Sequence, residues 1–302
     1  MNVEKAPDTS LTPDQFSVQD TGLVPTMVRA AAGARISTEP IRRNISILEG
    51  SGGNIAVLTG RDGKLLVDAG FTVSRRAIAD ALSSINFDPI KYLINTHWHT
   101  DHTDGNEWLH EAGAVILAHE NTRKHLSVAT HVEGWSYTFP AASAGAIPAQ
   151  VFAAEHTFQF NDTNVILKYY GPSHTDSDIS VNFAEADVVH VGDTWWNGVY
   201  PFIDYSTGGS IDGTIRAAEM NLAAVTDRTI VIPGHGAVGG KSNLAEYRDM
   251  LVTIRKRVAT LKKQGRSLDE TVAEKPTGPF DAKWGQFLIT PAMFTGLVYA
   301  GV

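Results

Sequence analysis

Short apolar runs alternate with amphipathic stretches over most of the 302-residue chain. Runs of about four to eight β-branched and aliphatic residues bounded by Gly, Asp or Asn are typical of strands, and apolar positions three and four apart are typical of helices. This pattern predicts strands at 44–50, 54–60, 64–70, 91–95, 114–118, 157–160, 164–171, 178–184, 187–193 and 228–234. It predicts helices at 73–85, 104–113, 119–129, 210–225 and 242–265. Strands that alternate with helices favour an α/β fold.

Three segments fall outside this pattern. Residues 1–43 are polar with scattered Pro, Gly and Ala, and we expect an N-terminal extension that wraps or precedes a main domain at 44–264. Residues 265–302 are aromatic and interrupted by Pro and Gly, so we expect a tail packed on the same domain. Residues 129–148 lack periodicity and are rich in Ala, Gly and Pro, which predicts a long loop or flap near the functional site.

Composition excludes several classes of site. The chain has no cysteine, so disulfides, thiolate zinc sites and cysteine nucleophiles are ruled out, and any metal must be held by His and carboxylate. The net charge of −8 and the lack of a basic run argue against a nucleic-acid partner. The start of the chain lacks a signal-peptide pattern, and no run approaches the ~18 apolar residues of a membrane helix. We therefore expect a soluble, cytoplasmic or periplasmic protein with a small-molecule substrate and no membrane partner.

The stretch "THWHTDH", residues 96–102, follows directly on a predicted strand. In an extended segment alternate side chains share a side, so His97, His99 and Asp101 would lie together, and a turn would bring His102 back toward them. Imidazole and carboxylate are the zinc ligands available to a chain without cysteine. This loop is therefore a candidate metal site.

Three further candidates, His174, Asp193 and His235, follow other predicted strands. Together with the four in the first loop they make seven. One zinc site needs about three protein ligands and an open position, and two sites need about six. The number favours a binuclear centre in which one carboxylate is shared.

The motifs "THWHTDH", "GPSHTDSDI", "VGDTWW" and "VIPGHG" occur in this order over about residues 44–262. They resemble those of the metallo-β-lactamase-fold hydrolase superfamily. The resemblance implies an αββα sandwich of two mixed β-sheets flanked by helices, with one or two metals at one end. It implies a first metal bound by His97, His99 and His174 and a second bound by Asp101, His102 and His235. Asp193 would bridge both, as in glyoxalase II enzymes and lactonases, and Asp68 would support a ligating histidine.

The implied chemistry is hydrolysis with two Zn²⁺ ions per chain. A hydroxide that bridges the metals would attack the carbonyl of a small-molecule ester, lactone, thioester or amide, with Asp101 as the catalytic carboxylate. Three alternatives stay open: β-lactamase-like activity on β-lactams, a mononuclear iron centre like that of persulfide dioxygenases, and a non-catalytic metal-binding protein. Asp193 and the complete "HTDH" argue against an efficient β-lactamase, and a non-catalytic protein has no use for an open metal position.

The substrate pocket is expected in the aromatic segment "TWWNGVYPFIDY", residues 194–205, directly after Asp193. Its candidate binding residues are Trp195, Trp196, Tyr200 and Phe202. If the segment is extended, the two adjacent tryptophans cannot both face the same way, so one of them is expected to line the site.

Overall fold

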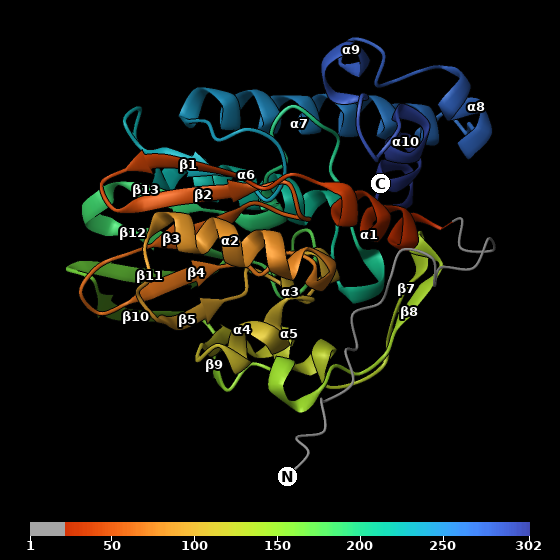
Figure 1. Ribbon diagram of the computed structural model, residues 1–302. Helices are drawn as coiled ribbons and strands as arrows, with labels where there is room; N and C mark the ends of the chain where they lie inside the picture. Colours follow the sequence, from red (N-terminus) through yellow and green to blue (C-terminus); the bar gives the residue numbers. More distant parts are fainter. Residues whose placement is uncertain (1–21) are drawn as a thin grey trace.

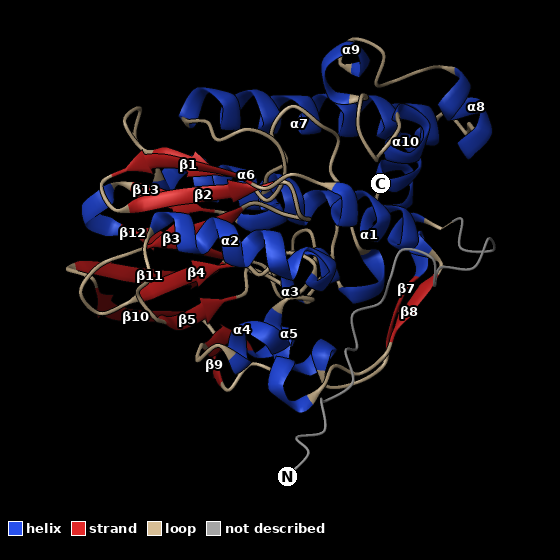
Figure 2. Ribbon diagram, in the orientation of Figure 1, coloured by secondary structure: helices blue, strands red, loops and turns tan. Residues whose placement is uncertain are grey.

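The apolar runs build two β-sheets that pack face to face, in a computed structural model that describes residues 22–302 (Figure 1 and Figure 2). The first sheet has the order β1-β2-β3-β4-β5-β6-β9 and contains Ser37–Arg42 (β1), Ile45–Glu49 (β2), Ile55–Leu58 (β3), Lys64–Val67 (β4), Ile90–Ile94 (β5), Val115–His119 (β6) and Gln150–Phe152 (β9). The second has the order β10-β11-β12-β13-β14 and contains Glu155–Phe160 (β10), Thr163–Tyr169 (β11), Ile179–Phe183 (β12), Val188–His190 (β13) and Ile230–Ile232 (β14).

Both sheets are mixed. Strands β1 to β4 are antiparallel neighbours, whereas β4, β5, β6 and β9 run parallel. In the second sheet β10 to β13 are antiparallel and β14 lies parallel to β13. The predicted αββα sandwich of two mixed sheets is confirmed.

Alternation along the strands divides the apolar side chains between two cores. Leu65 and Val67 of β4 pack between the sheets with residues such as Leu167 of β11, whereas Leu66 faces the opposite side and packs against Ile78. This is the two-residue period expected of a sheet that is covered on both faces.

Helices cover the outer face of each sheet (Figure 1). The helices are Leu23–Gly33 (α1), Arg75–Ile85 (α2), Thr100–Thr103 (α3), Asn106–Glu111 (α4), Glu120–Leu126 (α5), Ile211–Ala224 (α6), Lys241–Lys263 (α7), Leu268–Ala273 (α8), Asp281–Trp284 (α9) and Pro291–Ala300 (α10). Residues of α2 and α4 pack on the first sheet, and those of α6 and α7 on the second. None of the helices at 22–302 is long and apolar enough to cross a membrane.

The first sheet begins earlier than the boundary expected at residue 44. Strand β1 pairs antiparallel with β2, so Ser37–Arg42 is part of the sheet rather than of an extension. Its sequence "STEPIR" hid the strand because charged residues and Pro are typical of an edge strand, where they discourage pairing with other chains. Helix α1 precedes it, and residues 1–21 of the expected extension lie outside the described residues.

The segment 129–148 is not the featureless loop that its composition predicts. It contains an antiparallel hairpin of Thr130–Val132 (β7) and Tyr137–Phe139 (β8), joined by a 3₁₀ turn at Glu133–Trp135. Strands of three residues are too short to show a period in the sequence. The turn places Trp135 at the tip of the hairpin, where its side chain is 8% exposed.

The C-terminal segment packs on the second sheet's helix layer. Trp284 and Phe294 belong to the same apolar cluster as α7, and the ring of Phe294 stacks on Tyr200 with the ring centroids 4.7 Å apart. Residues 265–302 therefore share the core of the preceding residues.

Candidate metal centre

The seven candidate ligands lie in loops and short helical turns at one edge of the sandwich, with Asp101 and His102 in α3. His97 and His99 follow β5, Asp193 follows β13 and His235 follows β14. Strand β5 is parallel to β4, and β14 is parallel to β13, so within each sheet the carboxyl ends of the pair lie at one edge. The two edges adjoin, since Oδ2 of Asp193 after β13 lies 3.8 Å from Nε2 of His97 after β5. Sheet topology therefore brings together residues that are far apart in the sequence.

Four side chains form the first ligand group. His97, His99, His174 and Asp193 each offer one nitrogen or oxygen atom, and these atoms all lie within 4.8 Å of one another. Nε2 of His174 is 2.9 Å from Nδ1 of His99 and 3.3 Å from Oδ2 of Asp193. All four side chains are buried.

Three side chains form the second ligand group, with the same 4.8 Å limit. Nε2 of His235 lies 3.1 Å from Oδ2 of Asp101, and Nε2 of His102 lies 3.4 Å from the same oxygen. The side chain of His235 is 10% exposed and is the most open of the seven.

Asp193 lies between the two groups. Its Oδ2 is 3.3 Å from Nε2 of His174, while its Oδ1 is 3.2 Å from Nε2 of His102. Oδ2 is also 3.5 Å from Nε2 of His235. The carboxylate thus faces nitrogen atoms of both groups.

Hydrogen bonds at the far side of each ring fix the tautomers of the first group. Nδ1 of His174 donates to the backbone oxygen of Phe202 at 2.8 Å, since a carbonyl only accepts. Nε2 of His99 donates to the carboxylate of Asp204 at 3.1 Å. In the neutral form of both rings, the two nitrogen atoms that face each other at 2.9 Å are therefore both acceptors, and their lone pairs repel unless a cation lies between them.

Asp68 fixes the tautomers of His102 and His97. Its Oδ2 accepts a hydrogen bond from Nδ1 of His102 at 2.8 Å and another from Oγ1 of Thr96 at 2.8 Å. Because the Thr96 hydroxyl donates to Asp68, it accepts from Nδ1 of His97 at 3.1 Å. Asp68 thus contacts one ligand directly and a second through Thr96, and it leaves Nε2 of both rings facing the centre.

Unpaired buried atoms show that the donor set fits metal ions. Nε2 of His97, His102 and His235 and Oδ1 of Asp193 are buried and have no hydrogen-bond partner. An unpaired buried polar atom costs about 1–3 kcal/mol, so such atoms are rare without a function. Four of them within two adjoining groups of His and Asp side chains is the arrangement expected of metal ligands.

The charge state agrees with this interpretation. Burial, together with the neighbouring His102, lowers the pKa of His97 well below its usual range, so the ring is neutral, as a ligand must be. Burial opposes ionisation of Asp193, but His102 and His235 hold its pKa well below the usual range. Burial would lower the pKa of His235, yet Asp193 and Asp101 raise it to about 9. The two carboxylates therefore attract positive charge to the second group.

Two glycines make room for the ligands. A Cβ on Gly53 would meet the ring of His102, and a Cβ on Gly234 would meet Oδ1 of Asp193. Glycine is required at both positions because the backbone passes close to a candidate ligand, and not because φ is positive.

A cavity of about 370 Å³ opens beside the two groups, with His99, Asp101, Asp193 and His235 in its wall. Trp196 and Phe202 line this cavity, as expected for two of the four aromatic candidates.

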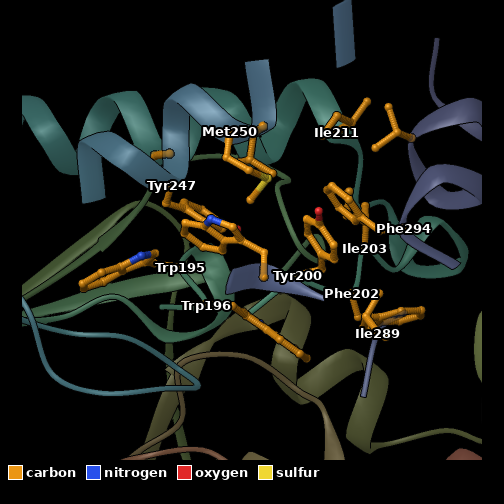
Figure 3. Close-up of a cluster of buried hydrophobic side chains, with 14 of the residues drawn as sticks. Trp195, Trp196, Tyr200, Phe202, Ile203, Ile211, Tyr247, Met250, Ile289 and Phe294 are labelled. Carbon is orange, nitrogen blue, oxygen red and sulfur yellow. The ribbon is translucent and has the colours of Figure 1, made fainter. Parts of the chain in front are cut away.

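The other two aromatic candidates, Trp195 and Tyr200, do not line the cavity. Trp195 has extended backbone, so it and Trp196 point in different directions, and Trp195 is fully buried in the adjacent core (Figure 3). Tyr200 is also fully buried, and its hydroxyl donates to Oδ1 of Asp281 at 2.8 Å. These two residues hold the C-terminal segment and the core rather than a substrate.

Sequence reasoning missed several residues of the site. Among them, Asp204 orients His99, and Trp135, Met27 and Phe287 line the cavity. No spacing pattern connects them to the histidines, because they come from the segment after β13, the β7–β8 hairpin, α1 and the segment after α9.

Comparison with known proteins agrees with the fold. The family model of the metallo-beta-lactamase superfamily matches residues 48–245. The stereoselective inverting sec-alkylsulfatase Pisa1 from Pseudomonas sp. is similar in structure, with a TM-score of 0.66 and 17% identity over 90% of this chain and 51% of that one. This chain thus spans about half the length of the alkylsulfatase.

Two metallo-beta-lactamases are similar over nearly their whole length. DIM-1 matches with a TM-score of 0.58 and 21% identity, over 72% of this chain and 98% of that one. The enzyme from Pontibacter korlensis matches with a TM-score of 0.57 and 17% identity, over 72% and 99%. The predicted family is confirmed: this chain belongs to the metallo-beta-lactamase superfamily.

Proposed function

We propose that this chain is a dinuclear zinc hydrolase that adds water to the carbonyl of a small-molecule ester, lactone, thioester or amide. The observation that carries the proposal is the position of Asp193, whose two oxygen atoms face His174 of one ligand group and His102 of the other at 3.3 and 3.2 Å. Seven donors exceed what a single tetrahedral zinc takes, and a donor set of imidazole and carboxylate suits Zn²⁺.

His97, His99 and His174 would hold one ion, Asp101, His102 and His235 the other, and Asp193 both. Two such ions supply a water that is deprotonated near neutral pH and a Lewis acid for the carbonyl oxygen.

The chain's own residues then position the substrate and the water. Asp101 lies in the cavity wall and is ionised, because His102 and His235 offset the effect of burial and hold its pKa well below the usual range. Its carboxylate would orient the attacking water by accepting a hydrogen bond from it. Trp135, Trp196 and Phe202 would exclude bulk water around the carbonyl.

Two alternative functions would leave part of the ligand groups or the cavity without a role. A mononuclear iron centre needs only the first group and leaves the three ligands of the second without a role. A non-catalytic metal-binding protein needs no cavity beside its metals, whereas four of the seven candidate ligand side chains contribute to the wall of this one: His99, Asp101, Asp193 and His235.

The test combines metal content with activity. We expect about two zinc ions per chain after loading and dialysis, and hydrolysis of at least one member of a panel of esters, lactones, thioesters, amides and β-lactams that is lost with chelator and restored by zinc. Asp101→Ala is expected to abolish activity, whereas the exposed Asp80→Ala on α2 serves as the matched control and should not.

Three results would contradict the proposal. One is a single iron with oxygen uptake and no hydrolysis. Another is a zinc-loaded protein that hydrolyses no carbonyl compound, or that acts on an alkyl sulfate alone. The third is an Asp101→Ala variant with unchanged activity.

A further inference from the structure

The cavity beside the ligand groups has two chemically distinct parts. Its polar wall consists of proposed ligands, among them His99, Asp101, Asp193 and His235. The rest is mainly apolar, and the volume of about 370 Å³ is in the range of small-molecule sites. The polar part suits the reacting carbonyl, and the apolar part must hold the remainder of the substrate.

Three segments outside the metal-binding loops build most of the apolar part. Helix α1 contributes Met27, Ala30 and Ala31. The β7–β8 hairpin contributes Trp135, whose ring stacks on Phe202 at 5.0 Å between centroids, and the segment after α9 contributes Phe287, which lies 6.4 Å from the ring of Trp196. Figure 1 shows α1, this hairpin and the C-terminal helices at the same end of the molecule.

Among the described residues that line the cavity, none is Lys or Arg. Arg29 of α1 is linked to the lining through a 3.2 Å hydrogen bond to Oγ1 of Thr26, but its own side chain is exposed. A carboxylate or phosphate placed against this apolar lining, away from the metals, would therefore lose part of its hydration without meeting a cation among the lining residues. Burial of an unpaired charge is strongly unfavourable.

We infer that the substrate is an uncharged carbonyl compound whose hydrocarbon group lies against α1, Trp135 and Phe287. This inference rests on the proposed function and narrows its substrate class. It makes Met27, Ala30 and Phe287 specificity-determining residues, and it assigns α1 to the substrate side of the site.

The first test is a chain-length series with the zinc-loaded full chain. p-Nitrophenyl acetate, butyrate and hexanoate should show kcat/KM rising about three- to fourfold per methylene, the factor expected when each CH₂ leaves water. The p-nitrophenyl half-ester of glutaric acid, which ends its acyl chain in a carboxylate, should react at least about tenfold more slowly than the pentanoate ester. Tryptophan fluorescence provides a readout without turnover: N-methylhexanamide should bind more tightly than N-methylacetamide.

The second test changes the charge of the wall. Ala30→Lys places an ammonium group at an exposed lining position and should reduce the preference for pentanoate over the glutarate half-ester at least about fivefold. Ala32→Lys is the matched control, because Ala32 is exposed on the same helix but does not line the cavity. Phe287→Ala should reduce the rise of kcat/KM with acyl chain length. Because the side chain of Phe287 is exposed, we expect this variant to fold.

The outcomes separate this inference from the proposed function. Hydrolysis with a flat chain-length series, a preference for the half-ester, or equal effects of the two lysine variants would overturn the substrate class and leave the hydrolase intact. A zinc-loaded protein that acts only on charged carbonyl compounds, or that binds neither amide, would overturn the substrate class. One that hydrolyses no carbonyl compound at all would overturn the proposed function too.

Discussion

Replacement of Asp204 by Asn tests whether the first ligand group depends on a carboxylate that touches no metal. Oδ2 of Asp204 accepts a hydrogen bond from Nε2 of His99 at 3.1 Å, and the residue is 1% exposed. The same oxygen accepts from Oγ1 of Thr207 at 2.6 Å, so the carboxylate is held in place. Asn has the same shape as Asp and keeps one acceptor oxygen, but it lacks the negative charge. That charge, through the hydrogen bond from Nε2, makes the His99 ring a stronger metal ligand.

The expected size of the effect follows from this geometry. Burial opposes ionisation of Asp204, but His99, the hydrogen bond from Thr207 and the nearby His174 together more than offset it and lower the pKa to about 2, so the charge is present at neutral pH. Removal of such an outer carboxylate weakens metal binding about 10- to 100-fold, or roughly 1.4–2.7 kcal/mol. Among the described residues, no hydrogen bond joins Asp204 to Asp101, His102 or His235. The loss should therefore appear at one of the two metal sites only.

The assay is a zinc titration in competition with a chromophoric chelator at pH 7, which resolves the two affinities. Asp187→Asn is the control, since it makes the same chemical change at a position where φ is 53°, which Asn tolerates, and away from the ligands. The reasoning is refuted if both affinities stay within about threefold of the parent protein, or if both fall equally while the control behaves like the parent.

Three further predictions follow from single contacts. Gly234→Ala should lower the zinc content to one ion per chain or fewer without loss of helical signal in circular dichroism, because the added Cβ meets Oδ1 of Asp193; two retained zinc ions would contradict this. Tyr200→Phe should lower the free energy of unfolding in urea by about 1–2 kcal/mol, through loss of the hydrogen bond to Asp281, with kcat/KM unchanged within about twofold; a change in KM alone would place Tyr200 in the pocket. Glu185→Gln should destabilise the protein by less than about 1 kcal/mol near pH 7, because the carboxylate is exposed. Hydrogen bonds from the neighbouring strand lower its pKa from 4.5 to about 2, so the stabilisation is present above pH 4.5 and disappears as the pH falls toward 2; a difference from the parent that persists at pH 2 would refute the assignment.

The strands and the long helices could be predicted because each carries its own period. The run at 64–70 predicted β4, and the apolar stripe at 242–265 predicted α7, with boundaries shifted by a few residues at most. Strand β1 could not be predicted in this way, because an edge strand with Pro40 and charged neighbours has no apolar alternation. The hairpin of β7 and β8 consists of strands too short to repeat a pattern.

The supporting contacts of the ligands were only partly predictable. Asp68 directly follows a predicted strand, and it contacts His102 as the resemblance implied. Asp204 contacts His99 across 105 positions of sequence, and a lone aspartate in an aromatic segment carries no signal for such a pairing. The tryptophan pair shows the same limit. An extended backbone predicts that one ring faces the site, but the choice of Trp196 goes with its backbone pairing to His235, which lies about 40 positions further along the chain.

The two halves of the site therefore differ in how sequence encodes them. Metal binding restricts the ligands to His and Asp, and the fold places them at strand ends, so spacing and residue type are enough to find them. The apolar wall requires only bulk and hydrophobicity, which many residue types supply, and its members come from α1, a hairpin and the segment after α9. Substitutions in those three segments should accordingly change substrate preference while zinc stoichiometry stays constant. Substitutions around Asp193 should instead lower the number of zinc ions bound per chain.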